Sequence, residues 1–415
     1  MRTRHTPRSA VALVALCGML GAASTAAAQE QSFSLVQRGK ALVDAGDCLP
    51  CHTKDEAKPF AGGRAIETPF GTIYSPNITP DRDTGIGAWS DEEFYQALHN
   101  GIGPDGTRLY PAFPYPYFTK MPRSDVMAVR AYLNTLQPIA STRPDNKLTW
   151  PLNHRVLMSG WNRLFFTPGT FTADPARSAE WNRGAYLVEG PGHCGACHTP
   201  KNALGGDKSG EALRGGQLQD WFVPNISNDS RNGLGAWSAD EIAEYLKTGR
   251  NGKSGASALM SEVVTHSTAK MSDADLHAIA TYLKSMPGTA ERQAVAAPDR
   301  AAMDAGKAIY LDSCAACHRS DGGGVAHMFP PLARNANVQS DDPTTVLRMI
   351  LQGGRTAVTD PRPTPSSMPA YGWKLDDAQV AAVATYVRNA WGNTAPAVSA
   401  EQVGSLKTRL TAVTQ

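Results

Sequence analysis

One short pattern, Cys-x-x-Cys-His, occurs three times in this chain of 415 residues. The copies span Cys48–His52, Cys194–His198 and Cys314–His318. This pattern is the attachment signature of a c-type haem, in which each of the two thiols bonds to one vinyl group of the porphyrin. The imidazole that follows can then bind the iron from one side of the ring. The sequence therefore predicts three covalently attached haems, with thioether bonds to Cys48, Cys51, Cys194, Cys197, Cys314 and Cys317, and with His52, His198 and His318 as iron ligands.

A haem explains these motifs better than a zinc site or a redox-active dithiol. A zinc site of this kind pairs two Cys-x-x-Cys motifs roughly 15–20 residues apart, whereas each motif here stands alone in the sequence. A thioredoxin-like dithiol needs a βαβ setting, and the sequence around the motifs shows no such alternation.

The first 28 residues have the layout of a secretory signal. Three arginines come first, an apolar run follows over residues 10–23, and Ala26–Ala28 forms a cleavage site of small residues. The seventh cysteine, Cys17, lies in this segment. A lipid anchor on it is disfavoured because Leu16 stands where a small residue is required. The sequence therefore predicts a periplasmic mature protein.

Charge and hydropathy limit the partners of the chain. It has 40 basic and 38 acidic side chains, a near balance that argues against a nucleic-acid partner, which normally needs a basic face. No apolar run after the signal approaches the ~20 residues of a membrane span. We therefore expect a soluble or peripherally attached protein, and its length indicates several domains.

Internal repeats indicate three copies of one helical domain. The segment around Asn77 and Trp89 recurs around Asn225 and Trp237, and each third of the chain ends in a helical pattern. Ser90 followed by Glu93 forms a capping box that predicts a helix start. The expected organisation is a signal over 1–28, domains over 29–142, 176–288 and 299–394, linkers over 143–175 and 289–298, and a tail over 395–415.

Two segments outside the repeats have two interpretations each. The linker contains Trp161 and Phe165, which either pack across two domains or form a docking surface. The tail has a capping box at Ser399 and an apolar stripe that includes Leu406 and Leu410. That stripe either covers the third domain or docks on a partner or the membrane.

The motifs resemble the class I cytochrome c pattern, with Cys-x-x-Cys-His near the start of each domain and a methionine before its last helix. The triple arrangement is similar to the cytochrome c subunit of membrane-associated bacterial dehydrogenases for alcohol, gluconate, fructose, sorbitol or aldehyde. The resemblance implies an all-α fold of three tandem class I cytochrome c domains. It also implies that haems relay electrons from a separate catalytic subunit to ubiquinone at the outer face of the cytoplasmic membrane. The segments that carry it are 75–80, 85–89, 181–187 and 197–202.

Each iron needs a ligand opposite its histidine, and a methionine thioether suits electron transfer. Met368 in the third domain and Met260 in the second precede the last helix in the expected way. The first domain departs from this pattern, because Phe113 stands opposite Met368 and cannot bind iron. Met121, eight residues later, is the candidate there, and another ligand or an open site is the alternative.

The leading functional hypothesis is an electron-transfer subunit without a substrate site of its own. The chain lacks the G-x-G-x-x-G and nucleophile-elbow patterns in the settings that would indicate nicotinamide or hydrolase chemistry. The alternative is a haem enzyme that uses an open first haem for peroxide or sulfur chemistry. Coordination distinguishes the two, because an electron carrier needs six-coordinate haems.

Overall fold

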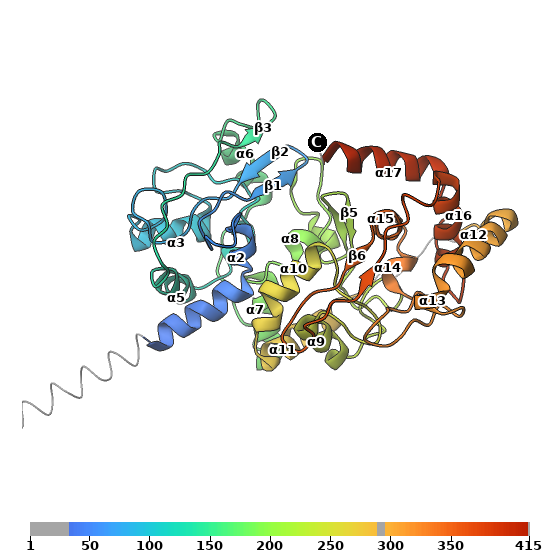
Figure 1. The fold of residues 1–415 in the computed structure, drawn as a ribbon. Helices are drawn as coiled ribbons and strands as arrows, with labels where there is room; N and C mark the ends of the chain where they lie inside the picture. The colour runs from blue at the N-terminus through green and yellow to red at the C-terminus, as the bar shows by residue number, and fades with distance from the viewer. Residues whose placement is uncertain (1–32, 289–294, 414–415) are drawn as a thin grey trace, which may run out of the picture.

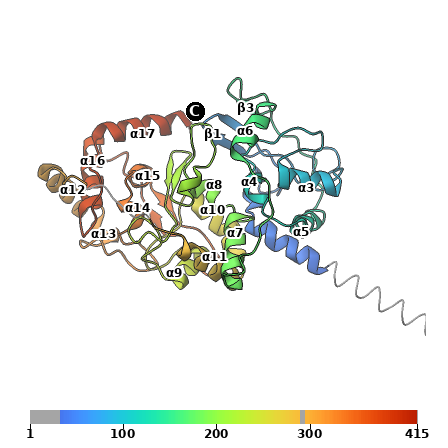
Figure 2. The same cartoon turned by 180° about the vertical axis from the view of Figure 1, so that it is seen from behind.

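The computed structural model describes residues 33–288 and 295–413. Three mainly helical domains lie side by side in chain order (Figure 1), and the view from behind shows the second domain between its neighbours (Figure 2). The predicted signal over 1–28, with Cys17, lies outside the described residues. The expected all-α class is confirmed, with short strand pairs added to each domain.

The first domain contains two helices that cross and a small sheet that the sequence did not predict. Its strand β3 comes from the expected linker and pairs with β2. The elements are the helix over residues 33–45, α2 (Cys48–Cys51), β1 (Ala65–Thr68), β2 (Gly71–Tyr74), α3 (Asp91–Asn100), α4 (Tyr115–Phe118), α5 (Arg123–Leu133) and β3 (Lys147–Leu148).

The second domain repeats this order after the connecting helix α6 (Leu157–Phe165). Its strands form an antiparallel pair. The elements are α7 (Ala179–Glu189), α8 (Gly195–His198), η1 (Ser209–Glu211), β4 (Gly216–Leu218), β5 (Trp221–Val223), α9 (Ala239–Thr248), α10 (Leu259–His266), η2 (Thr268–Lys270) and α11 (Asp273–Ser285).

The third domain is shorter between its first and last long helices, and a further helix follows it. The elements are α12 (Arg300–Ser313), α13 (Ala315–His318), α14 (Ala336–Gln339), α15 (Thr344–Gln352), β6 (Gly354–Arg355), β7 (Ser367–Met368), α16 (Asp377–Asn389) and α17 (Ala400–Val413).

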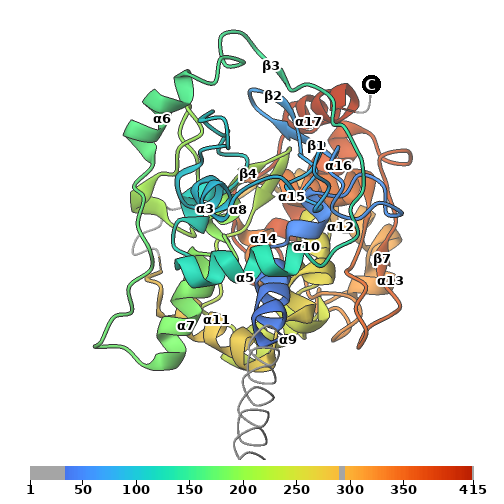
Figure 3. The ribbon, with the colours of Figure 1, turned by 90° about the vertical axis from the view of Figure 1, so that its left-hand side faces the viewer.

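A glycine lets the first and last long helices of every domain cross in close contact. A Cβ atom on Gly39 would lie 1.9 Å from the Ala128 carbonyl oxygen, which no side chain tolerates. The two helices of the first domain cross steeply at this point (Figure 3). The same contact recurs in the other domains, at Gly184 against Ala278 (1.9 Å) and at Gly306 against Ala382 (2.2 Å).

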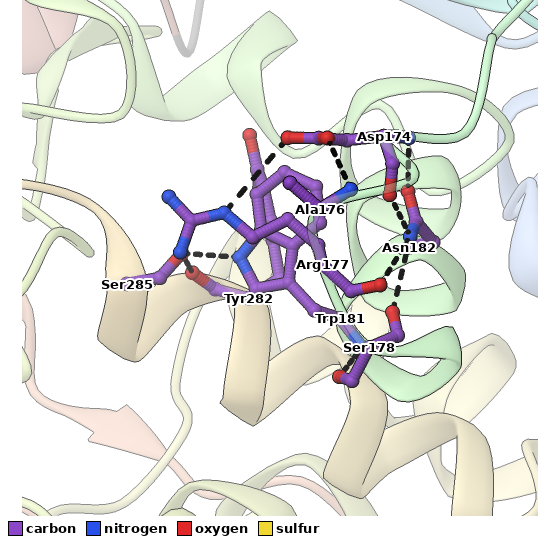
Figure 4. Close-up of polar contacts among 8 residues, drawn as sticks. All are labelled: Asp174, Ala176, Arg177, Ser178, Trp181, Asn182, Tyr282 and Ser285. Carbon is purple, nitrogen blue, oxygen red and sulfur yellow. Dashed lines mark hydrogen bonds and ion pairs between the residues drawn. The ribbon is translucent and has the colours of Figure 1, made fainter.

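The start of α7 shows how one of the sequence segments builds this crossing (Figure 4). Asn182 closes the preceding loop, because its side chain accepts from the Asp174 N–H and donates to the Asp174 carbonyl, at 2.7 and 2.9 Å. Trp181 lies across α11, where its indole N–H donates to Ser285 Oγ at 2.7 Å and its ring meets Tyr282 edge-on. Arg177 stacks on the other side of that indole. Polar and aromatic contacts together therefore hold α7 in position on α11.

Local capping signals in the sequence are confirmed. Ser90 accepts from the Glu93 N–H at 3.2 Å, and the Glu93 side chain accepts from the Ser90 N–H at 2.7 Å. Ser238 with Glu241 forms the same capping box at α9. Since such boxes satisfy N–H groups that a helix start leaves unpaired, they fix where these helices begin.

The first two domains share one hydrophobic core, whereas the third has its own. Val126 and Leu133 of α5 belong to the same cluster of buried side chains as Leu187 and Leu276 of the second domain. The hydrophobic core of the third domain gathers around α16 and includes residues of α17. The repeats thus predict the number of domains but not that two of them join into one apolar core.

The linker and the tail both pack against the domains. In α6, the Trp161 indole N–H donates to the Leu204 carbonyl at 2.9 Å, and Asn162 accepts from the Tyr115 hydroxyl, so this helix bridges the first two domains. In α17, Leu406 and Leu410 are buried in the third core. Packing is therefore the correct interpretation for Trp161 and for the α17 stripe.

Among the described residues, no helix combines the length and apolar character needed to cross a bilayer.

Gly306→Ala should destabilise the third domain. Alanine normally stabilises a helix by roughly 0.5–1 kcal/mol relative to glycine, but this Cβ would force α12 away from α16, and overpacking costs about 1–3 kcal/mol. Thermal unfolding of the haem-loaded protein, followed by circular dichroism, should show a lower midpoint. Gly160→Ala in α6 is the matched control, because an added Cβ there meets nothing within 4 Å. Equal stability of the two variants would contradict the close crossing.

Candidate haem-binding sites

Each motif histidine is oriented by a hydrogen bond from its ring to a proline carbonyl. The distances from Nδ1 are 2.8 Å for His52 to Pro76 and 2.7 Å for His198 to Pro224, and His318 repeats the contact with Pro330 at 3.0 Å. A carbonyl oxygen only accepts, so Nδ1 must carry the proton. Nε2 therefore keeps its lone pair, which is the arrangement that an iron ligand requires.

A glycine with positive φ donates a hydrogen bond to the backbone carbonyl of each motif histidine. The Gly62 N–H donates to the His52 carbonyl at 2.7 Å, and Gly215 and Gly324 do the same for His198 and His318 at 2.8 and 3.1 Å. The φ angles are 75°, 89° and 62°, and an added Cβ would strike the segment that carries the proline carbonyl. Glycine is therefore required at all three places.

Sequence reasoning missed these glycines and prolines. The prolines of the first two domains lie in a repeated signal, Pro76-Asn77 and Pro224-Asn225, in which the asparagine side chain accepts an N–H two residues later. That repeat could have identified the two carbonyls. Each glycine follows its motif at a different spacing, so no fixed pattern marks it.

Burial keeps the three imidazoles neutral. It lowers the pKa of His52, His198 and His318 below the ordinary value for histidine, and the hydrogen bond to the carbonyl opposes this effect only in part. A neutral imidazole is the form that binds a metal. The electrostatic surroundings of the three rings therefore agree with their geometry.

None of the six motif cysteines forms a disulfide. They lie on or beside the short helices α2, α8 and α13. Burial raises the pKa of Cys51 to about 12 and that of Cys314 to about 11. Reactive cysteines have lowered pKa values, whereas those of Cys51 and Cys314 are raised.

In the third domain one cavity brings the predicted groups together. Cys314, Cys317, His318 and Met368 all line it, and its empty space, including the part open to solvent, is about 680 Å³. The structure thus brings the predicted thiols, imidazole and thioether to one cavity.

Met368 is positioned by a strand pair and by two anchors on α12. Met368 pairs with Gly354 in the β6–β7 ladder. Just beyond it, the Tyr371 hydroxyl donates to the Ser313 carbonyl at 2.6 Å, and Lys374 forms an ion pair with Asp312 at 3.0 Å. These contacts tie the methionine loop to the residues directly before Cys314.

The other two predicted methionines lie in different surroundings. Met260 is partly buried in the first turn of α10, beside a small apolar cluster of Ala256, Val264 and Ala357. Met121 is only 2% exposed and belongs to the core shared by the first two domains. The structure therefore places Met121 as a tightly packed core residue.

The first two motifs approach each other across the domain interface. Helix α10 of the second domain packs on α2 of the first, and Glu262 forms an ion pair with Arg64 at 2.8 Å. Besides burial and the Asp47 carboxylate, the neighbouring Cys197 thiol contributes to the raised pKa of Cys51. Two haems attached here would lie close together.

Comparison with known proteins agrees with this geometry. The cytochrome c family model matches residues 36–137, 182–287 and 303–391, and the chain belongs to that family. It is 41% identical over 407 residues to the cytochrome c subunit of a quinone alcohol dehydrogenase from Gluconacetobacter polyoxogenes, covering 93% of this chain and 87% of the relative.

Two further relatives have similar names. The gluconate 2-dehydrogenase cytochrome c subunit of Pantoea cypripedii is 40% identical over 413 residues, covering 94% of this chain and 93% of the relative. The fructose dehydrogenase cytochrome subunit of Gluconobacter japonicus is 36% identical over 406 residues, covering 90% and 82%. With three matched domains and three motifs, the chain carries three covalently bound haems c, and its function is electron transfer.

The double substitution Cys314→Ala and Cys317→Ala should reduce the haem content from three to two. Without the two thiols no thioether bond can form at the third motif, while the other two sites lie in a separate core. Intact-protein mass spectrometry after acid–acetone extraction counts only covalent haem. Ser313→Ala, which changes the residue next to the motif, should retain three. Three retained haems in the double variant would contradict the attachment at Cys314 and Cys317.

Proposed function

We propose that this chain is the electron-transfer subunit of a membrane-bound dehydrogenase complex in the periplasm. A separate catalytic subunit of flavin, quinoprotein or molybdenum type oxidises the substrate, and the haems pass the electrons to ubiquinone. The names of the relatives support this, since they are cytochrome subunits of alcohol, gluconate and fructose dehydrogenases. The signal pattern over 1–28 supports the location.

The single observation that carries the proposal is the threefold histidine arrangement. Three rings, buried at His318 and partly buried at His52 and His198, each donate Nδ1–H to a proline carbonyl and leave Nε2 free. The proposed roles are thioether attachment by Cys48, Cys51, Cys194, Cys197, Cys314 and Cys317, iron ligation by His52, His198 and His318, and a second iron ligand from Met260 and Met368.

When bound, the haems supply reversible one-electron chemistry. The contribution of the chain is to hold them rigidly. The hydrogen bonds to carbonyls fix the histidine rings, and the contacts around Tyr371 fix the methionine loop of the third domain. Rigid sites suit electron transfer because little has to rearrange when an electron arrives.

Contacts between neighbouring domains also support a relay in series. The second domain contacts both neighbours, and its Gly255 and Ser257 complete the wall of the cavity in the third domain. Arg250 donates to Ser366 Oγ and to the Thr364 carbonyl, both at 2.9 Å, beside that cavity. A relay through three haems in chain order therefore fits the arrangement of the domains.

Ubiquinone should oxidise the reduced protein. After reduction with dithionite and removal of the excess, mixing with ubiquinone-1 in detergent should bleach the reduced haem band in a stopped-flow experiment. Ubiquinol-1 is the matched control and should leave the band unchanged. If ferricyanide oxidises the haems and ubiquinone-1 does not, the chain is an electron carrier with a different acceptor.

Exposed apolar side chains in the linker support a peripheral membrane contact. Trp150 is 76% exposed and Leu164 is 68% exposed, and both lie in the segment around β3 and α6, which runs along the upper edge of the molecule in Figure 3. Such side chains gain free energy when they enter a bilayer interface.

Replacing Trp150 and Leu164 with serine should therefore weaken membrane binding by several-fold in a liposome flotation assay. Both side chains are exposed, so the folded protein should keep its three haems. Leu311→Ser, which changes an exposed leucine (49%) on α12 of the third domain, is the control for a general loss of apolar surface. Unchanged flotation of the double variant would exclude this segment as the contact.

A further inference from the structure

The loop after α3 in the first domain begins and returns through the same backbone contacts as the loop after α9 in the second, although it is one residue longer. Each helix ends at a glycine with positive φ, Gly101 at 64° and Gly249 at 75°. Each glycine carbonyl then accepts an N–H from the returning loop, from Leu109 at 2.8 Å and from Ala256 at 2.7 Å. This contact fixes the register of the two loops.

Four residues after the returning residue, the two loops differ. The second domain has Met260 at this place, and the first has Phe113. Phe113 is partly buried, and its ring lies 5.4 Å from that of Phe118. The proposed thioether ligand of the second domain is thus replaced by a hydrocarbon side chain in the first.

Met121 occupies a different place, which the helix crossings define. Each domain has one alanine whose carbonyl contacts the crossing glycine of the first long helix. The residues seven positions before these alanines are Met121, Met271 and Leu375. All three are buried, with exposures of 2%, 8% and 7%. The third domain has a leucine here and a separate methionine, Met368, in its cavity. This place is therefore a core position, distinct from that of the iron ligand.

The tyrosines of the same loop are engaged elsewhere. The hydroxyl of Tyr110 donates to the Leu152 carbonyl at 3.0 Å. Those of Tyr115 and Tyr117 donate to side chains of α6 and of the second domain. Burial raises the pKa of Tyr115 and Tyr117 well above the ordinary range for tyrosine, so neither supplies a phenolate ligand.

Two histidines lie near this loop. His193 of the second domain meets the Phe118 ring edge-on, and its Nε2 is engaged by the Gly46 carbonyl at 3.2 Å. His99 stacks on Tyr95 of its own helix, with ring centroids 4.9 Å apart, and forms a hydrogen bond to the Thr119 backbone. These contacts fix its ring against α3 and the chain before Met121. Its Nδ1 is buried without a partner, and the experiment below includes it for that reason.

We propose that the chain gives the iron of the first haem only one ligand, His52, and that a small neutral ligand binds on the face where Phe113 replaces a methionine. The ligand class is a diatomic molecule that binds ferrous haem, such as carbon monoxide. The apolar Phe113 offers such a molecule neither charge nor hydrogen bond. This inference rests on haem attachment at the first motif and is independent of the dehydrogenase and of the electron acceptor.

Carbon monoxide titration of the reduced, fully haem-loaded protein tests the proposal. The difference spectrum should reach an end point of one carbon monoxide per three haems. Phe113→Met should abolish this binding, because a thioether then fills the position, and should shift the potential of one haem toward the range of the other two. Met368→Leu is the positive control and should raise the stoichiometry from one to two.

Two further variants exclude the other candidates. Met121→Leu, a volume-conserving core change that usually costs under about 1.5 kcal/mol, should leave both the stoichiometry and the potentials unchanged. His99→Gln should also leave them unchanged. A wild-type protein that binds no carbon monoxide overturns the proposal, and gain of binding in Met121→Leu or His99→Gln would then identify the ligand. Binding that persists in Phe113→Met would place the open iron in another domain and equally overturn it.

Discussion

The hydrogen bond from each histidine ring to a proline carbonyl is the contact on which the three sites depend. It fixes the tautomer and the direction of the ring, and both decide whether Nε2 can reach an iron. The loop that supplies the carbonyl must return to the motif from 24, 26 or 12 residues away. The position of this loop is fixed in turn by a glycine whose N–H donates to the backbone carbonyl of the motif histidine. A side chain at Gly62, Gly215 or Gly324 would displace the proline segment and with it the ring.

Features with a local cause could be predicted from the sequence. The motifs, the capping boxes at Ser90 and Ser399, and the helical class follow from neighbouring residues, and the structure agrees with them. The number of domains follows from the repeats. The glycines that bind the histidine carbonyls could not be predicted, because their spacing from the motif differs in every domain. The short strand pairs also escaped prediction, since two to four residues are too few to show an alternating pattern.

Long-range packing explains the rest of what the sequence could not show. The apolar faces of α5 and α11 both pack on other helices. The hydrophobic periodicity of the sequence does not reveal whether the neighbouring helix belongs to the same domain. The structure shows that Tyr186 of the second domain donates to the buried Asp125 of the first. Similarly, the α17 stripe is compatible with several partners in the sequence, and the arrangement of α16 decides that the third core receives it.

The order of the domains bears on what an incompletely ligated haem means for a relay. The second domain lies between its neighbours, because it shares a core with the first domain and contributes to the wall of the cavity in the third. The first site is at one end of the series. A methionine missing from the middle site would place an iron of different potential in the path of every electron. A methionine missing from the end site alters only the step at which electrons enter or leave the series. In the proposed relay, the departure at Phe113 therefore falls in a terminal domain, outside the exchange between the other two haems.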